Sequence, residues 1–206
     1  HVRSRRQRQM CIRDRIKGEQ GFVQARTFKT HFEVVTFMQN KILVNGSYQQ
    51  NTPTSDVKTE TKVEFTYEVE VKANDTATIE KFGGYVVSTN HPKNELINAA
   101  ENVLSQANEQ GYEQLLINQK EAWAKIWEMA DITIEGDTKA QQGIRFNIFQ
   151  LNQTYSGKDA RLNIGPKGFT GEKYGGSTYW DTEAYCLPFY MVTKNQEVAR
   201  NLLMYR

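Results

Sequence analysis

The sequence predicts a multidomain protein with both α and β structure, in which an antiparallel β part comes first and helices follow. Two observations predict this order. Up to His91, apolar and polar side chains alternate, as they do in half-buried strands. After His91-Pro92 the apolar spacing becomes that of helices. Several short strands separated by turn signals fit part of a β-sandwich.

Composition narrows the class of protein. The 206 residues are enough for one large or two small domains, and 26 Lys and Arg against 24 Asp and Glu leave a net charge of +2. Because much of that surplus lies in the first fifteen residues, no nucleic-acid partner is expected. Cys11 and Cys186 are too few for a disulfide framework or a metal site, which favours a reducing compartment. Without a long apolar run or a signal-peptide pattern, we expect a cytoplasmic protein with no membrane partner.

Residues 1–17 are assigned to a non-native or disordered basic tail. The string from His1 to Ile16 is similar to translated sequencing-adapter sequence, and a basic nucleic-acid or targeting arm is the alternative. The fold prediction therefore begins at Gly18, and we expect the native N-terminus to be missing.

Residues 18–91 are assigned to part of an N-terminal β-sandwich domain. The clearest strand is Thr61 to Lys72, in which apolar and polar residues alternate strictly. The other expected strands are Gly21 to Phe28 and His31 to Met38, which form a hairpin, Lys41 to Val44 before the turn Asn45-Gly46, and Thr76 to Ser88. His31 and His91 are isolated from other ligand types, so neither is expected to bind a metal.

Residues 92–130 are assigned to a helical linker, with helices at 94–110 and 112–129 separated by Gly111. Trp123 and Trp127 lie one turn apart and are expected to pack against a neighbouring element. Residues 131–206 should hold an extended segment at 131–136 and a helix at 138–155 with a stripe of Ala140, Ile144, Ile148 and Leu151. Two further helices are expected at 182–192, kinked or ended by Pro188, and at 196–206. The last helix has no C-terminal cap, which predicts that the chain continues beyond residue 206.

The stretch from Gly168 to Tyr185 carries the functional signal. Its glycines let a backbone approach a ligand closely, and its aromatic rings beside carboxylates suit the flat faces and hydroxyls of a sugar. The structural alternative is that Trp180 is a core tryptophan and that Asp181 caps the helix beginning near Thr182.

This stretch resembles the Trp-Asp-Thr-Glu segment of glycoside hydrolase family 65, the inverting disaccharide phosphorylases. The matching residues are Tyr174, Gly176, Tyr179, Trp180, Asp181, Thr182 and Glu183. Ser177 stands where the broad family pattern has histidine, which favours the maltose phosphorylase branch. The segment Arg145 to Leu151 is similar to the first helix of the catalytic barrel, although surface roles are the better interpretation of Arg145 and Gln150.

The resemblance implies the rest of the hypothesis. Residues 131–206 would begin an (α/α)6-barrel catalytic domain, and Trp180, Asp181, Glu183, Tyr179 and Gly176 would bind the substrate. Inorganic phosphate would be the co-substrate, with no further cofactor and no metal, and the parent enzyme would convert maltose to β-glucose 1-phosphate and glucose. The family's single glutamic acid, which protonates the glycosidic oxygen, lies downstream of this segment. The 206-residue chain should therefore be inactive alone.

Other functional interpretations of the same residues stay open. Trehalose, kojibiose and nigerose phosphorylases share the family, as do hydrolases in which a second carboxylate activates water. A homodimer is one expected assembly of the parent. A function of another class is a non-catalytic carbohydrate-binding β-sandwich protein with a helical appendage.

Overall fold

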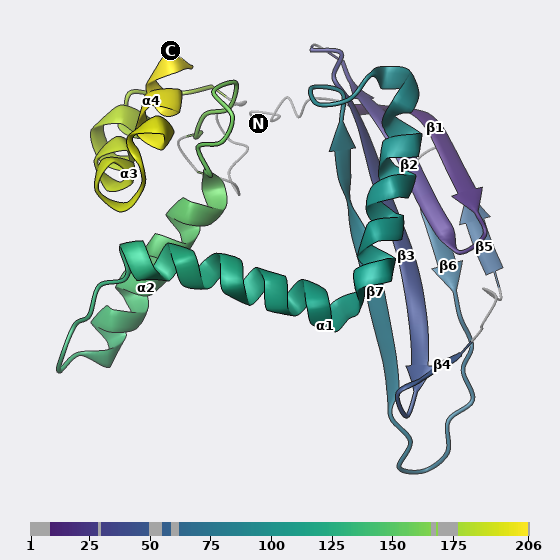
Figure 1. The fold of residues 1–206 in the computed structure, drawn as a ribbon. Coiled ribbons are helices and arrows are strands. Elements are labelled where there is room, and N and C mark those ends of the chain that lie inside the picture. Colours follow the sequence, from purple (N-terminus) through teal and green to yellow (C-terminus); the bar gives the residue numbers. More distant parts are fainter. Residues whose placement is uncertain are drawn as a thin grey trace, which may run out of the picture. The chain divides into compact units, whose positions relative to one another are not determined.

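The computed structural model describes residues 9–28, 30–49, 55–58, 62–165, 168 and 177–205. The chain divides into two compact units, one reaching Asn118 and the other beginning at Gln119. The first unit holds the strands and the start of the long helix α1, and the second holds the remaining helices (Figure 1). Each unit has a separate apolar core.

An antiparallel sheet of five strands forms the body of the first unit. Its strands are β1 (Gln9–Lys17), β2 (Gln20–Thr27), β3 (Glu33–Val44), β4 (Ser47–Gln49) and β7 (Ala77–Val87). Strand β3 pairs with β2 and β4, and also with β7 along nearly its whole length. The expected hairpin is confirmed as β2–β3, and Asn45 and Gly46 turn the chain into β4 with φ angles of 51° and 79°. The expected strand at 41–44 is the end of β3.

A smaller sheet lies against the large one. Strands β5 (Ser55–Lys58) and β6 (Val63–Thr66) pair antiparallel. A side-chain Cβ at Gly21 of β2 would lie 2.7 Å from Cγ1 of Val63 and 3.0 Å from the ring of Phe65. The absence of a side chain at Gly21 therefore lets the two sheets approach closely.

The structure shortens one expected strand. Alternation predicts a strand from Thr61 to Lys72, but β6 ends at Thr66, which pairs with Ser55 at the start of β5. From Phe65 to Glu70 the side chains still alternate between half-buried and exposed. Alternation indicates which face of the segment is covered, whereas a strand also needs a hydrogen-bonded neighbour. Within the described residues, β5 provides such a neighbour as far as Thr66.

The structure also differs from the expected tail. Residues from Gln9 to Lys17 form β1, paired with β2 from Lys17↔Gln20 to Gln9↔Thr27. The Lys17 ammonium lies 2.9 Å from the Glu101 carboxylate on α1, and Arg15 lies 3.8 Å from it. Arg15 and Lys17, two of the basic side chains that suggested a disordered tail, thus form ion pairs with Glu101.

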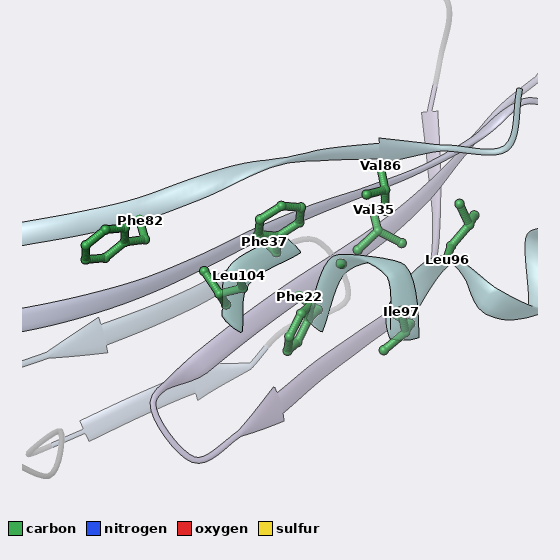
Figure 2. Packing of buried hydrophobic residues seen from close by; sticks show 9 residues of the cluster. Phe22, Val35, Phe37, Phe82, Val86, Leu96, Ile97 and Leu104 are labelled. Atoms are coloured by element: carbon green, nitrogen blue, oxygen red, sulfur yellow. The ribbon is translucent and has the colours of Figure 1, made fainter. Parts of the chain in front are cut away.

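The core of the first unit lies between the large sheet and the first turns of α1 (Leu96–Ala130). Figure 2 shows Phe22, Val35, Phe37, Phe82 and Val86 of the sheet facing Leu96, Ile97 and Leu104 of α1. On the helix, Leu96, Ala100 and Leu104 are spaced at i, i+4 and i+8 and are fully buried. A short 3-10 turn, η1 (Lys93–Glu95), leads into this helix.

Helix α1 is broken at Gly111, where the sequence predicted an interruption. The backbone there has φ 73° and ψ 169°, a conformation that is essentially restricted to glycine. A Cβ at this position would have no heavy atom within 4 Å, so the restriction comes from the backbone itself. The two expected helices are therefore confirmed as segments of α1 on either side of Gly111.

Helix α2 (Thr138–Thr154) begins the next part of the second unit, capped by Asp137, whose side chain accepts from the Ala140 amide. The expected stripe is partly buried, because Ile148 is buried and Ala140 is exposed. Trp123 stacks on Phe149 of α2 with ring centroids 4.9 Å apart, and Trp127 lies beside Trp123 at 6.0 Å. The tryptophan pair packs against a neighbouring element, as the sequence indicated.

The connection between α1 and α2 is not a strand, although alternation suggested an extended segment at 131–136. The Gln141 amide replaces a strand neighbour: it donates to the Ile132 carbonyl at 2.8 Å and accepts from the Ile134 amide at 2.6 Å. One turn later, Arg145 donates two hydrogen bonds to Asp131, at 2.8 and 2.5 Å. Arg145 is thus an exposed, ion-paired charge, in agreement with the surface role expected for it.

Three short helical elements complete the second unit. They are η3 (Thr182–Cys186), a π-helical turn, then α3 (Leu187–Thr193) and α4 (Gln196–Met204). The expected helix at 182–192 corresponds to η3 and α3 together, and the expected helix at 196–206 corresponds to α4, which ends at Met204. None of the helices in the described ranges combines the length and the apolar character that a membrane span requires.

We expect Gly111→Ala to destabilise the protein, because alanine at φ 73°, ψ 169° carries about 1–3 kcal/mol of backbone strain. The matched control is Gly143→Ala within α2, where a Cβ would meet nothing within 4 Å and should instead stabilise by roughly 0.5–1 kcal/mol. Urea unfolding followed by circular dichroism measures both changes. An unfolding midpoint for Gly111→Ala at or above that of wild type would contradict the assignment.

The Asp131–Arg145 pair predicts a pH effect. Hydrogen bonding from Arg145 holds the pKa of the Asp131 carboxyl below its ordinary value of 3.8. Because the folded-state pKa is the lower one, the pair stabilises the fold above the ordinary value, and this stabilisation is lost as pH falls through the folded-state pKa. Arg145→Gln should raise the pKa of Asp131, measured by NMR titration of its carboxyl carbon. Asp159, whose pKa Arg161 lowers to about 2, is the internal control and should not change.

Candidate functional site

The candidate site is the segment from Ser177 to Cys186, which leads from a stretch without regular secondary structure into η3. Of the five substrate-binding candidates, Tyr179, Trp180, Asp181 and Glu183 fall in this segment. Gly176, like Tyr174, lies outside the described residues. The glycine-rich approach expected before the segment falls largely on residues 169–176, which are also outside them.

Burial divides the segment into an inner and an outer side. Thr182 is 2% exposed, Cys186 is half-buried and Tyr190 is fully buried, so the positions spaced by four face the core. On the other side Trp180 is 67% exposed and Tyr185 is 70% exposed. Exposed aromatic side chains also occur elsewhere in the described residues, for example Tyr85 and Phe146.

Two long-range hydrogen bonds hold the inner side. The Thr182 hydroxyl donates to the Ile164 carbonyl at 3.0 Å, and the Tyr190 hydroxyl donates to the Leu151 carbonyl at 2.7 Å. Both donors join the end of α2 and its following loop to the η3–α3 helix. The apolar core around them consists of Tyr155, Ile164, Tyr190, Val198 and Leu202, with Cys186, Leu187 and Phe189 packed against it.

A wide turn lies between these anchors. The Leu187 amide donates to the Thr182 carbonyl, which is the i→i+5 pattern of a π-turn. Pro188 explains why the turn is wide. It has no N–H to donate to the Ala184 carbonyl, and its ring would clash with that carbonyl in a regular α-helix. The sequence predicted a kink or an end at Pro188, and the chain responds with a π-turn followed by α3.

Trp180 does not lie in the core of the described residues, since it is 67% exposed. Its ring lies beside that of Tyr185, with centroids 6.2 Å apart and planes inclined by 38°. Tyr179, the residue before it, is 41% exposed. Tyr185 was not among the candidate site residues, because its contact with Trp180 depends on the width of the turn between them.

Asp181 does not cap the helix that it precedes. Its backbone is already helical, and its side chain makes no capping hydrogen bond. Asp137 and Asn195 stand at the equivalent places of α2 and α4, have extended backbones and accept from the amides of Ala140 and Val198. The capping interpretation of Asp181 is therefore wrong, and its exposed carboxylate is not used by the helix start.

Asp181 and Glu183 act electrostatically on Cys186. Burial raises the pKa of the Cys186 thiol, and the negative charges of Asp181 and Glu183 raise it further. Burial likewise raises the pKa of Tyr190, the next residue of the inner side. Asp181 is exposed and Glu183 is half-buried, so the two carboxylates have different surroundings. This arrangement favours a neutral thiol, which is a poor nucleophile.

The segment thus offers an exposed indole, an exposed phenol ring and an exposed carboxylate on one short stretch of chain. Rings of this kind present flat apolar faces, and a carboxylate accepts hydrogen bonds from hydroxyl groups. Within the described part of the chain, no group of three or more His, Cys, Asp or Glu side chains could hold a metal ion. The chemistry available to this site is recognition of a ligand that is both ring-shaped and hydroxylated.

Two parts of the chain match models of known protein families. Residues 1–126 match the glycosyl hydrolase family 65 N-terminal domain, and residues 145–206 match the family 65 central catalytic domain. The candidate site lies within the second match.

The relatives are longer proteins. The chain is 50% identical over 148 residues to maltose phosphorylase of Bacillus subtilis (strain 168), covering 72% of this chain and 19% of that protein. It is 34% identical over 191 residues to α,α-trehalose phosphorylase of Thermoanaerobacter brockii, covering 93% of this chain and 24% of that protein. The solved structure of a "Putative kojibiose phosphorylase from human microbiome" superposes with a TM-score of 0.83 at 27% identity, covering 96% of this chain and 25% of that one.

The chain thus spans a quarter or less of the length of these relatives. One family model covers more than half of the chain, and a second covers the candidate site. The chain therefore belongs to glycosyl hydrolase family 65.

Proposed function

We propose that this chain is part of an inverting disaccharide phosphorylase that cleaves maltose with inorganic phosphate. Trp180 and Asp181 line the subsite for the non-reducing glucosyl unit in this proposal, with Tyr179, Glu183 and Gly176 around them. The single observation that carries it is the outward presentation of the Trp180 indole beside an Asp181 carboxylate that caps no helix. The 50% identity to a maltose phosphorylase supports the substrate.

The chemistry follows from the roles of these groups. The indole provides a flat wall and an N–H donor, and the carboxylate accepts from sugar hydroxyls. A phosphate oxygen would attack the anomeric carbon while the bond to the leaving oxygen breaks, and a carboxylic acid would donate its proton to that oxygen. Attack from the opposite face inverts the centre and gives β-glucose 1-phosphate and glucose.

We assign no general acid among residues 1–206. Asp181 and Glu183 are two positions apart, one exposed and one half-buried, and do not form a facing pair across one bond. In this proposal the acid follows the Trp-Asp-Thr-Glu segment further along the sequence, in the remainder of the (α/α)6 barrel that α2 begins. The first unit is then part of the N-terminal β-sandwich domain, and the protein acts in the cytoplasm without a further cofactor.

A second candidate function is phosphorolysis of another α-linked disaccharide. The similarity to a trehalose phosphorylase and to a solved structure described as a kojibiose phosphorylase supports it. Ser177 favours maltose, because the family pattern has histidine at this position outside the maltose branch. Ser177 is exposed and lies three residues before Trp180.

We expect Trp180→Ala and Asp181→Asn each to weaken binding of glucose and maltose about tenfold. The first removes a stacking face, and the second removes a charged hydrogen-bond acceptor worth about 1.5–3 kcal/mol. Saturation-transfer NMR on the purified chain measures the affinities. Trp127→Phe is the control, because Trp127 packs beside Trp123 and should affect stability rather than binding. Equal affinities in wild type and Trp180→Ala would contradict the subsite.

We also expect no phosphorolysis by the purified 206-residue chain, since the general acid is not assigned within it. Maltose and inorganic phosphate are incubated with the chain, and β-glucose 1-phosphate is assayed. The full-length Bacillus subtilis maltose phosphorylase serves as the positive control. Phosphate-dependent product from the chain alone would show that the acid lies among these residues.

A further inference from the structure

We propose that Tyr185 is a further sugar-contacting residue of this site, and that Pro188 and Thr182 are positioning residues that set it beside Trp180. This inference rests on the proposed function and extends it. The ligand class is a sugar of at least two rings, because two neighbouring aromatic rings present more flat surface than one pyranose ring covers.

The contact between Trp180 and Tyr185 depends on the shape of the turn. In a regular α-helix each residue advances by about 100°, so residues five apart point about 140° away from each other. A π-turn closes i→i+5, so each of its residues advances by less than 100°, and residues on its two sides point less far apart. Trp180 stands just before this turn, where its carbonyl accepts from the Ala184 amide at 3.0 Å, and Tyr185 stands within it. The centroid distance of 6.2 Å between the two rings is consistent with the wide turn at Thr182–Cys186.

Pro188 and Thr182 fix this turn from its two ends. Pro188 cannot donate to the Ala184 carbonyl, so the chain is denied the α-helical hydrogen bond at this point. Thr182 is buried, and its hydroxyl donates to Ile164 O at 3.0 Å, which holds the start of the turn against the core. With Thr182 held inward and the turn widened by one residue, Tyr185 emerges on the outer side.

Both rings stand outside the core that the described residues form, so a ligand can reach them in this chain. Trp180 and Tyr185 are 67% and 70% exposed, although they contact each other. A ring pair that served only the fold would be expected to lie in the core that begins one residue further on, at the half-buried Cys186. The Tyr185 hydroxyl adds a donor and acceptor at the rim of the apolar surface.

The first arm of the test measures geometry without any sugar. In wild type, nuclear Overhauser effects should connect the Trp180 indole with the Tyr185 ring. They should persist in Tyr185→Phe and disappear in Pro188→Ala, because the restored N–H allows an α-turn. If the ring contact persists unchanged in Pro188→Ala, the positioning role of Pro188 is overturned.

The second arm measures binding by saturation-transfer NMR with glucose and maltose. Tyr185→Ala should weaken maltose binding about fivefold and glucose binding less, whereas Tyr185→Phe should retain most of the affinity. Tyr85→Ala is the matched control, since Tyr85 is a 75% exposed tyrosine on β7 and should leave binding unchanged. Equal maltose affinity in Tyr185→Ala and wild type overturns this subsite alone. Absence of binding of either sugar to wild type overturns the proposed function and the subsite with it.

Discussion

The hydrogen bond from the Thr182 hydroxyl to the Ile164 carbonyl determines which side of the candidate segment faces the core. Once Thr182 is held inward, the helical phase buries Cys186 and Tyr190 and leaves Trp180 and Asp181 outside. Rotating the helix by half a turn about its axis would instead bury Trp180 and Asp181 and expose Cys186 and Tyr190. The site is therefore a consequence of how a buried polar group is satisfied, because an unpaired hydroxyl in the core would cost about 1–3 kcal/mol.

The same dependence on backbone hydrogen bonding appears in the long helix. In α1 a glycine at positive φ interrupts the hydrogen-bond ladder, and at the start of α3 Pro188, which has no N–H, follows the widened turn of η3. Each irregular backbone segment adjoins regularly packed helix residues. These are Leu96 to Leu104 in the first unit and Tyr190 to Leu202 in the second. The regular parts provide the stability that lets the irregular parts keep an unusual geometry.

The sequence predicted the features that depend on side-chain periodicity. It missed the features that depend on which segments pair with or pack against one another. The hairpin β2–β3, the break at Gly111 and helix α2 follow from side-chain spacing and from residue types with one dominant conformation. Strand β6 is shorter than its alternation suggests, since a strand also needs a neighbour, and β1 was missed because its charges concealed its pairing with β2. The contact of Trp180 with Tyr185 could not be read from spacing, since five residues apart in an α-helix predicts no contact.

Under the proposed function, ligand recognition and proton transfer are separate tasks, and the surroundings of the two acidic residues fit this division. A general acid needs a raised pKa, which burial or a neighbouring charge provides. Asp181 is exposed, and its carboxylate oxygens suit hydrogen bonding to hydroxyls. The burial that would favour a proton donor is found instead at Cys186 and Tyr190, whose pKa values are raised but which face the core. Under the proposed function, the outer side of the segment contacts the sugar, and the proton comes from another group.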